Sequence, residues 1–119
     1  MKNIKKQATI WKRFPKIPFI EANQFGEIRT IDHWTTYKNG RRKLIKGRIL
    51  RQYNDGRGYM QVSVSVNGKR ITLKVHRIVA VCFIPNPNGY PEVNHIDCDR
   101  SNNRVDNLEW CTSQYKSLS

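Results

Sequence analysis

The most regular pattern in the chain is an alternation of apolar and polar residues on either side of Asn67-Gly68. Residues 60–66 and 71–75 both alternate in this way. A period of two residues indicates β-strands, and Asn-Gly is typical of the tight turn that joins the strands of a hairpin. We therefore expect a β-hairpin whose apolar face covers a core. Its other face carries six polar side chains: Gln61, Ser63, Ser65, Arg70, Thr72 and Lys74.

Segments before this hairpin also have extended patterns. The apolar positions of residues 11–20 are interrupted by Pro15 and Pro18, and prolines this close together exclude a regular helix. Residues 25–31 are typical of a turn followed by a short strand.

After the hairpin the pattern becomes helical and then returns to strands. The apolar residues of 76–84 share one helical face, which predicts a short buried helix that ends before a proline. Residues 93–97 and 108–112 are predicted strands, separated by a long polar loop rich in Asn and Asp. Ser113 is suited to cap a terminal helix. The fold class is therefore α+β.

Charge is distributed unevenly along the chain. The formal net charge is +13, and residues 1–80 hold 19 Lys and Arg against 4 Asp and Glu, whereas residues 81–119 hold 3 against 5. Such an excess of positive charge indicates a polyanion partner. We expect phosphate contacts from a basic arm over the first nine residues, from the hairpin face with Arg70, Thr72 and Lys74, and from a basic loop or hairpin tip around Asn39-Gly40. This last segment contributes Arg41, Arg42, Lys43, Lys46 and Arg48. A solvated loop and an ordinary solvated sheet face are the alternatives.

Cysteine usage and hydropathy limit the other classes of protein. Three cysteines with no C-x-x-C pair argue against a disulfide framework and a structural zinc site, so we expect reduced thiols. No apolar run is long enough to span a bilayer, so no membrane partner is expected. These features favour a cytoplasmic protein.

Three stretches together resemble the ββα-metal nuclease module of the HNH family, which is common in phages and mobile introns. They are Val75-His76-Arg77-Ile78-Val79-Ala80, Val93-Asn94-His95, and Asn102-Asn103-Arg104-Val105-Asp106-Asn107-Leu108-Glu109-Trp110. The segment around Trp11, Ile28 and Arg29 is similar to a DNA-binding motif often fused ahead of such modules. The resemblance implies a basic, β-rich DNA-binding part at residues 1–57. The hairpin, the short helix and the HNH module would follow at 58–119, with a terminal helix short enough to be a truncated one.

The resemblance also implies roles for individual residues. His95 would be the general base that activates water, and Asn94 would help to hold one divalent metal, Mg²⁺ or Mn²⁺. Asn107 would be the second residue of the catalytic set, because it would fix the loop between the two strands. The second metal ligand of the family falls at residue 116, which is Lys116 here, and Gln114 is the nearest residue with an oxygen donor. An imidazole titrates near neutral pH and is suited to accept a proton from water, although a structural histidine is the alternative. We expect His76 to pack at the start of its helix and His33 to lie at the surface.

These observations leave three functions open. The first is a metal-dependent endonuclease acting on double-stranded DNA, encoded by a phage or mobile element of a bacterial host and acting as a monomer. The second is a nuclease-derived DNA-binding protein in which Lys116 impairs catalysis, because a protonated lysine offers no lone pair to a metal. The third is a basic RNA-binding or ribosome-associated protein.

Overall fold

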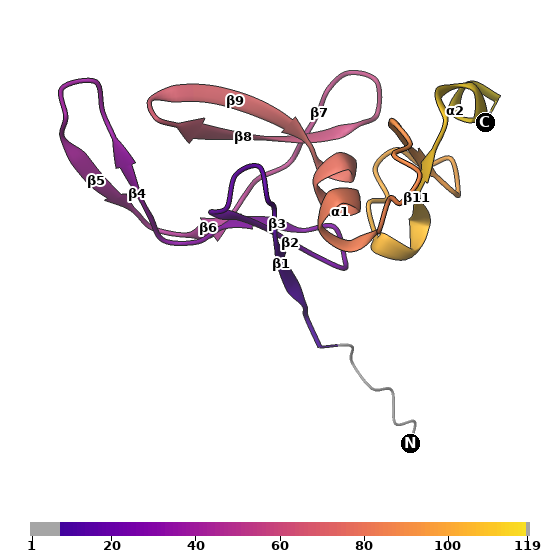
Figure 1. Cartoon of the computed structure of the whole chain (residues 1–119), viewed down its shortest axis with the longest axis horizontal. Coiled ribbons are helices and arrows are strands. Elements are labelled where there is room, and N and C mark those ends of the chain that lie inside the picture. The colour runs from indigo at the N-terminus through magenta and orange to yellow at the C-terminus, as the bar shows by residue number, and fades with distance from the viewer. Residues whose placement is uncertain (1–7, 119) are drawn as a thin grey trace.

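The computed structural model describes residues 8–118, except for the side chains of residues 117 and 118. The predicted basic arm, with Lys2, Lys5 and Lys6, therefore lies outside the described residues apart from its last two positions. The chain forms a mixed α+β structure, mostly strands with two α-helices, which confirms the predicted fold class (Figure 1). None of the helices in the described part of the chain is long and apolar enough to cross a membrane.

The first sheet is antiparallel and has the strand order β1-β2-β3-β6. Its strands are β1 (Trp11–Arg13), β2 (Ile20–Asn23), β3 (Ile28–Thr30) and β6 (Arg48–Ile49). The turn from β2 to β3 is held by the buried Asn23, whose side-chain oxygen accepts the backbone N–H groups of Phe25 and Glu27 at 3.0 Å each. Gly26 in this turn has φ +89°, and a Cβ there would lie 2.7 Å from the backbone oxygen of Asn103. The turn thus packs directly against the C-terminal loop.

Two hairpins extend from this sheet toward the same side of the molecule, at the left of Figure 1. The first pairs β4 (His33–Thr36) with β5 (Arg42–Ile45), so the basic segment around Asn39-Gly40 is a hairpin. The second belongs to a sheet of β7 (Tyr53–Asn54), β8 (Met60–Val66) and β9 (Lys69–Lys74). Its turn has φ 51° at Asn67 and φ 82° at Gly68. These positive φ values are the reason for an Asn-Gly turn, and the predicted hairpin is confirmed.

The C-terminal part begins with helix α1 (Val75–Phe83). It continues through β10 (Glu92–His95), the short 3₁₀ helix η1 (Val105–Asn107), β11 (Leu108–Cys111) and α2 (Ser113–Leu118). The strand predicted over 93–97 ends at His95. The predicted cap of the last helix is wrong by one residue, because the backbone N–H of Tyr115 donates to the Thr112 hydroxyl at 3.1 Å.

One hydrophobic core joins the N-terminal and C-terminal parts. Helix α1 packs against β2 on one side and against β8 and β11 on others. The buried core residues are Phe14, Ile20, Ala22, Ile28, Leu50, Val62, Val64, Val75, Ile78, Val79, Ala80, Val93 and Leu108. Because this core includes residues on both sides of position 57, it fixes β10, β11 and their loop relative to the first sheet.

His33 lies differently from the expectation. It is half-buried, and its ring stacks on Phe19 with centroids 3.7 Å apart and planes 2° from parallel. His33 therefore lies at the surface only in part, because its ring packs against the segment that precedes β2.

Candidate active site and nucleic-acid surface

His95 and Asn94 meet at the end of a strand. Strand β10 pairs antiparallel with β11, places His95 opposite Leu108 and then ends in a turn, in which the backbone N–H of Cys98 donates to the His95 carbonyl at 2.9 Å. Both side chains are buried and line one cavity of about 100 Å³. The other lining residues are Tyr59, Cys98, Arg100 and Lys116. Neighbouring side chains of a β-strand point to opposite faces, and the end of β10 at His95 allows Asn94 and His95 both to reach this cavity.

The imidazole of His95 is oriented by an amide. Its Nε2 atom lies 2.7 Å from the side-chain oxygen of Asn103. That oxygen only accepts hydrogen bonds, so Nε2 carries the proton and Nδ1 keeps its lone pair. Burial lowers the pKa of His95 below its usual value, the Asn103 hydrogen bond opposes this, and the positive charge of Lys116 lowers it further. The ring is therefore neutral at pH 7 and able to accept a proton.

Asn107 holds the loop between the two strands and does not line the cavity. Its side-chain oxygen accepts the Asp97 backbone N–H at 3.0 Å. Its Nδ2 donates to Asp97 Oδ1 at 2.9 Å and to the Asn102 carbonyl at 2.8 Å. These bonds fix the loop that carries Asn103, and a catalytic contribution of Asn107 stays a prediction.

Tyr59 connects the site to the hairpin, and no local pattern in the chain predicts this role. Its ring centre lies 5.1 Å from that of His76 and 6.0 Å from that of His95. Three cationic groups surround the same ring: the Arg100 guanidinium at 4.8 Å, the Lys116 ammonium at 5.3 Å and the Lys74 ammonium at 5.8 Å. Cations are attracted to the face of an aromatic ring at such distances. Tyr59 therefore gathers positive charge beside His95.

His76 packs against the rings of Tyr59 and His95. It is buried, and burial together with the nearby positive charges lowers its pKa to about 3. Its ring lies 5.2 Å from that of His95, and its Nδ1 has no hydrogen-bond partner among the described residues. A neutral ring in this position supports the packing of Tyr59 and His95, as expected for a histidine at the start of α1.

The residues at this cavity do not fit a divalent metal held by protein side chains. Among the described residues, no carboxylate lines it and Asn94 supplies the one side-chain amide oxygen, whereas Arg100 and Lys116 supply positive charge. No group of three or more His, Cys, Asp or Glu residues suited to a metal occurs within residues 8–118. The Lys116 ammonium lies 3.4 Å from Glu92 Oε1. Lys116 thus lies at the cavity, where the sequence placed the departure from the family, whereas Gln114 is exposed and does not line it.

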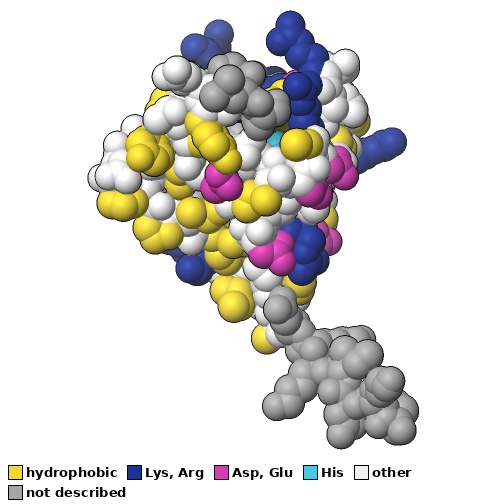
Figure 2. All heavy atoms as spheres, turned by 90° about the vertical axis from the view of Figure 1, so that its right-hand side faces the viewer, with side chains coloured by type: hydrophobic (Ala, Val, Ile, Leu, Met, Phe, Trp, Pro, Cys, Tyr) yellow, Lys and Arg dark blue, Asp and Glu magenta, His cyan; other side chains and the backbone are white. Residues whose placement is uncertain are grey.

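The predicted DNA-contacting residues lie at several places on the surface. Arg48 and Arg70 line a cleft between the hairpins, and Arg42 and Lys43 lie on β5. Lys74 instead pairs with Asp55 and approaches Tyr59, so it belongs to the surroundings of His95. Figure 2 shows Lys and Arg side chains at the upper edge of the C-terminal side, around a small exposed patch of histidine. Arg41 and Thr72 are exposed, and Lys46 lies 3.4 Å from Asp32 at the surface.

Comparison with known proteins identifies the class of this domain. Residues 73–118 match the family model described as HNH endonuclease. The chain is 48% identical over 71 residues to an uncharacterized HNH endonuclease, L245, of Acanthamoeba polyphaga mimivirus. The aligned residues are 60% of this chain and 22% of the relative. The chain is 35% identical over 118 residues to a second one, L247, covering 93% of this chain and 26% of the relative.

A characterised homologue is similar in both sequence and structure. The DNA endonuclease I-HmuI of Bacillus phage SP01 is 34% identical over 86 residues, which cover 69% of this chain and 48% of the relative. A solved structure described as DNA binding and cleavage by the HNH homing endonuclease I-HmuI matches with a TM-score of 0.69 and 26% identity, over 92% of this chain and 56% of that one. The chain therefore carries an HNH endonuclease domain and is homologous to I-HmuI. It spans less than half the length of the curated relatives it matches.

Proposed function

We propose that this chain is a DNA endonuclease of the HNH type, which hydrolyses phosphodiester bonds of double-stranded DNA. The observation that carries the proposal is the His95–Asn103 hydrogen bond at the edge of a cationic cavity. The Nδ1 lone pair of His95 accepts the proton of the attacking water, and Asn103 holds the ring in the required tautomer. The homology to I-HmuI supports DNA as the substrate.

The cationic side chains around Tyr59 have a complementary role in this proposal. Arg100 and Lys116 line the cavity and bind the scissile phosphate, which places the phosphorus atom within reach of the activated water. HNH nucleases generally use a divalent metal. Asn94 is the residue at the cavity that would offer an amide oxygen to Mg²⁺ or Mn²⁺, and such an ion would supply Lewis-acid activation of the phosphate.

The test compares the parent with His95→Ala on supercoiled plasmid DNA. We expect the substitution to abolish nicking and to leave DNA binding nearly unchanged, because a general base acts in the transition state. Tyr90→Ala is the control, because Tyr90 is an exposed ring in the turn before β10 and lines neither this cavity nor the cleft between the hairpins. A His95→Ala protein that nicks as fast as the parent contradicts the assignment.

A second candidate function is DNA binding without turnover. The specific observation in its favour is Lys116, whose ammonium lies at the cavity where the family has a metal ligand. An ammonium there binds the phosphate in place of a metal, which gives tight binding and slow hydrolysis. The two functions separate in one experiment: a parent chain that binds DNA without cutting it, and that cuts after Lys116→Asn, supports this second function.

The location of the protein in the cell and its oligomeric state are also part of the proposed function. Relatives from a phage and a giant virus support action on DNA inside an infected cell. Action in the cytoplasm of a bacterial host, and as a monomer, stays a prediction.

A further inference from the structure

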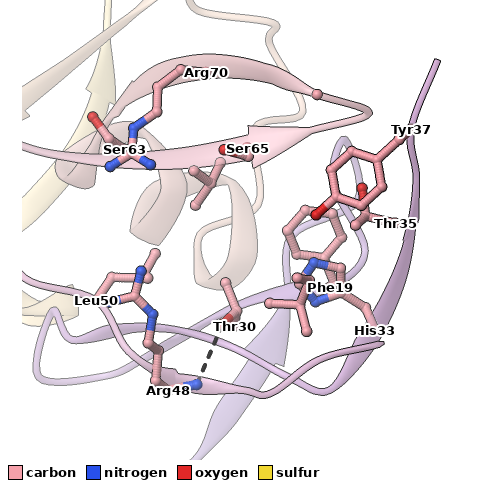
Figure 3. Close-up of a pocket in the computed structure, with 13 residues that line it drawn as sticks. Phe19, Thr30, His33, Thr35, Tyr37, Arg48, Leu50, Ser63, Ser65 and Arg70 are labelled. Atoms are coloured by element: carbon pink, nitrogen blue, oxygen red, sulfur yellow. Dashed lines mark hydrogen bonds between the residues drawn. The ribbon is translucent and has the colours of Figure 1, made fainter. Parts of the chain in front are cut away.

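A cleft of about 310 Å³ lies between the two hairpins, and none of its lining residues lines the His95 cavity. Figure 3 shows that Ser63 and Arg70 border it from β8–β9, Arg48 and Leu50 from the segment of β6, and Thr35 and Tyr37 from the β4 end. It therefore has a wall from each of three elements that are distant in sequence.

The charge of this cleft is positive and uncompensated. Arg48 and Arg70 both line it, and within residues 8–118 no Asp or Glu does. Neither guanidinium forms an ion pair within the described part of the chain. Two unpaired guanidinium groups facing one cleft attract an anion, and their planar donors suit phosphate. The cleft also has hydroxyl groups, which donate to phosphate oxygens: Thr30, Thr35, Tyr37, Ser63 and Ser65.

The shape of the cleft indicates more than a free phosphate ion. One wall is the stacked pair of Phe19 and His33, and the buried Leu50 forms part of the lining. Apolar and aromatic walls beside cationic groups suit a ligand with both a carbon ring and an anionic group. Its volume lies at the lower end of the range typical of sites for small organic ligands. A sugar ring with its phosphate has this chemistry.

The two hairpins that flank the cleft indicate which kind of sugar-phosphate binds in it. Each strand of a DNA duplex has the major groove on one side and the minor groove on the other. We propose that the cleft holds the sugar-phosphate backbone of one DNA strand between Arg48 and Arg70, so that β4–β5 and β8–β9 enter the two grooves that flank it. This inference rests on the proposed function, and it deepens it by stating how the duplex lies on the protein.

The first experiment measures the salt dependence of binding to duplex DNA for Arg48→Gln and Arg70→Gln. Each variant should lose affinity on the order of tenfold, as for a hydrogen bond to a charged group. Each should also lower the slope of log K against log salt by about 0.9, as for one lost phosphate contact. Arg13→Gln is the matched control, because Arg13 is exposed on β1 and does not line the cleft. Equal effects of all three substitutions overturn the inference.

The second experiment locates the DNA directly. Cys98→Gly removes the exposed thiol, and glycine suits the φ of 65° at that position. In this background, Ser65→Cys places a thiol in the cleft and Asn88→Cys places one in the exposed turn after α1. We expect duplex DNA to slow alkylation at position 65 and to leave position 88 unchanged. Alkylation at 65 that is unaffected by bound DNA overturns the inference.

Duplex RNA separates this arrangement from general attraction to phosphate. The major groove of A-form RNA is too deep and narrow for side chains to read, so two hairpins cannot occupy both of its grooves. Duplex RNA at saturating concentration should therefore protect position 65 much less than DNA does, and equal protection overturns the inference. Failure of the proposed function is distinct, because it is a parent chain that does not nick plasmid DNA, whereas these experiments measure binding alone.

Discussion

Replacing Lys116 tests how the cavity handles positive charge. Lys116 lines the cavity of about 100 Å³, so a divalent cation held there would lie on the order of 5 Å from its ammonium. At that separation a single and a double positive charge repel each other by about 7 kcal/mol at an effective dielectric constant of about 20. Water and movement of the lysine toward Glu92, 3.4 Å away, reduce this repulsion. We expect Lys116→Asn to relieve at least about 1.4 kcal/mol of this repulsion. That relief would lower the metal concentration needed for half-maximal cleavage about tenfold.

The assay is single-turnover cleavage of plasmid DNA across a titration of Mg²⁺ or Mn²⁺. Lys116→Asn and Lys116→His supply a donor atom, whereas Lys116→Met removes the charge without adding one. Improvement by Asn and His beyond that by Met assigns the gain to metal ligation, and equal improvement by all three assigns it to charge alone. A parent that cuts well at low metal, with no benefit from any substitution, refutes the placement of residue 116 at a ligand position.

Three further predictions follow from the same geometry. Because the pKa of His95 lies below its ordinary value, cleavage should persist below pH 6.5 and decline only as the pH falls through this lowered pKa, which a pH–rate profile checks. His76 has a folded-state pKa of about 3, so the unfolded chain binds a proton that the folded chain does not once the pH falls below about 6.5. The free energy of unfolding should therefore drop by about 2 kcal/mol more between pH 7 and pH 5 in the parent than in His76→Phe, measured by urea denaturation. Gly26→Ala should destabilise the fold by about 1–3 kcal/mol and lower cleavage more than DNA binding, because a Cβ 2.7 Å from the Asn103 backbone displaces the partner of His95. An alanine variant with unchanged thermal stability and activity would show that the turn and the loop are not in contact.

Local sequence patterns identified the elements that are stabilised by their own neighbours in the chain. Alternation and Asn67-Gly68 define the second hairpin, because a period of two residues sets its buried face and the positive φ values set its turn. The helical periodicity before Pro85 defines α1 in the same way. Three short stretches, residues 75–80, 93–95 and 102–110, together indicated the HNH domain, and the family match over residues 73–118 confirms it.

Tertiary structure alone decided which side chains meet. Tyr59 joins His95, Arg100 and Lys116 because α1 packs between the hairpin sheet and the C-terminal strands, and no local pattern reports such a contact. Asn103 becomes the partner of His95 because the loop is held by Asn107 within the module. The sequence by itself therefore determined the second hairpin, helix α1, the β10 and β11 strands, the domain class and the residue types of the site. The positions of these residues relative to one another depend on long-range burial, which only the packed core establishes.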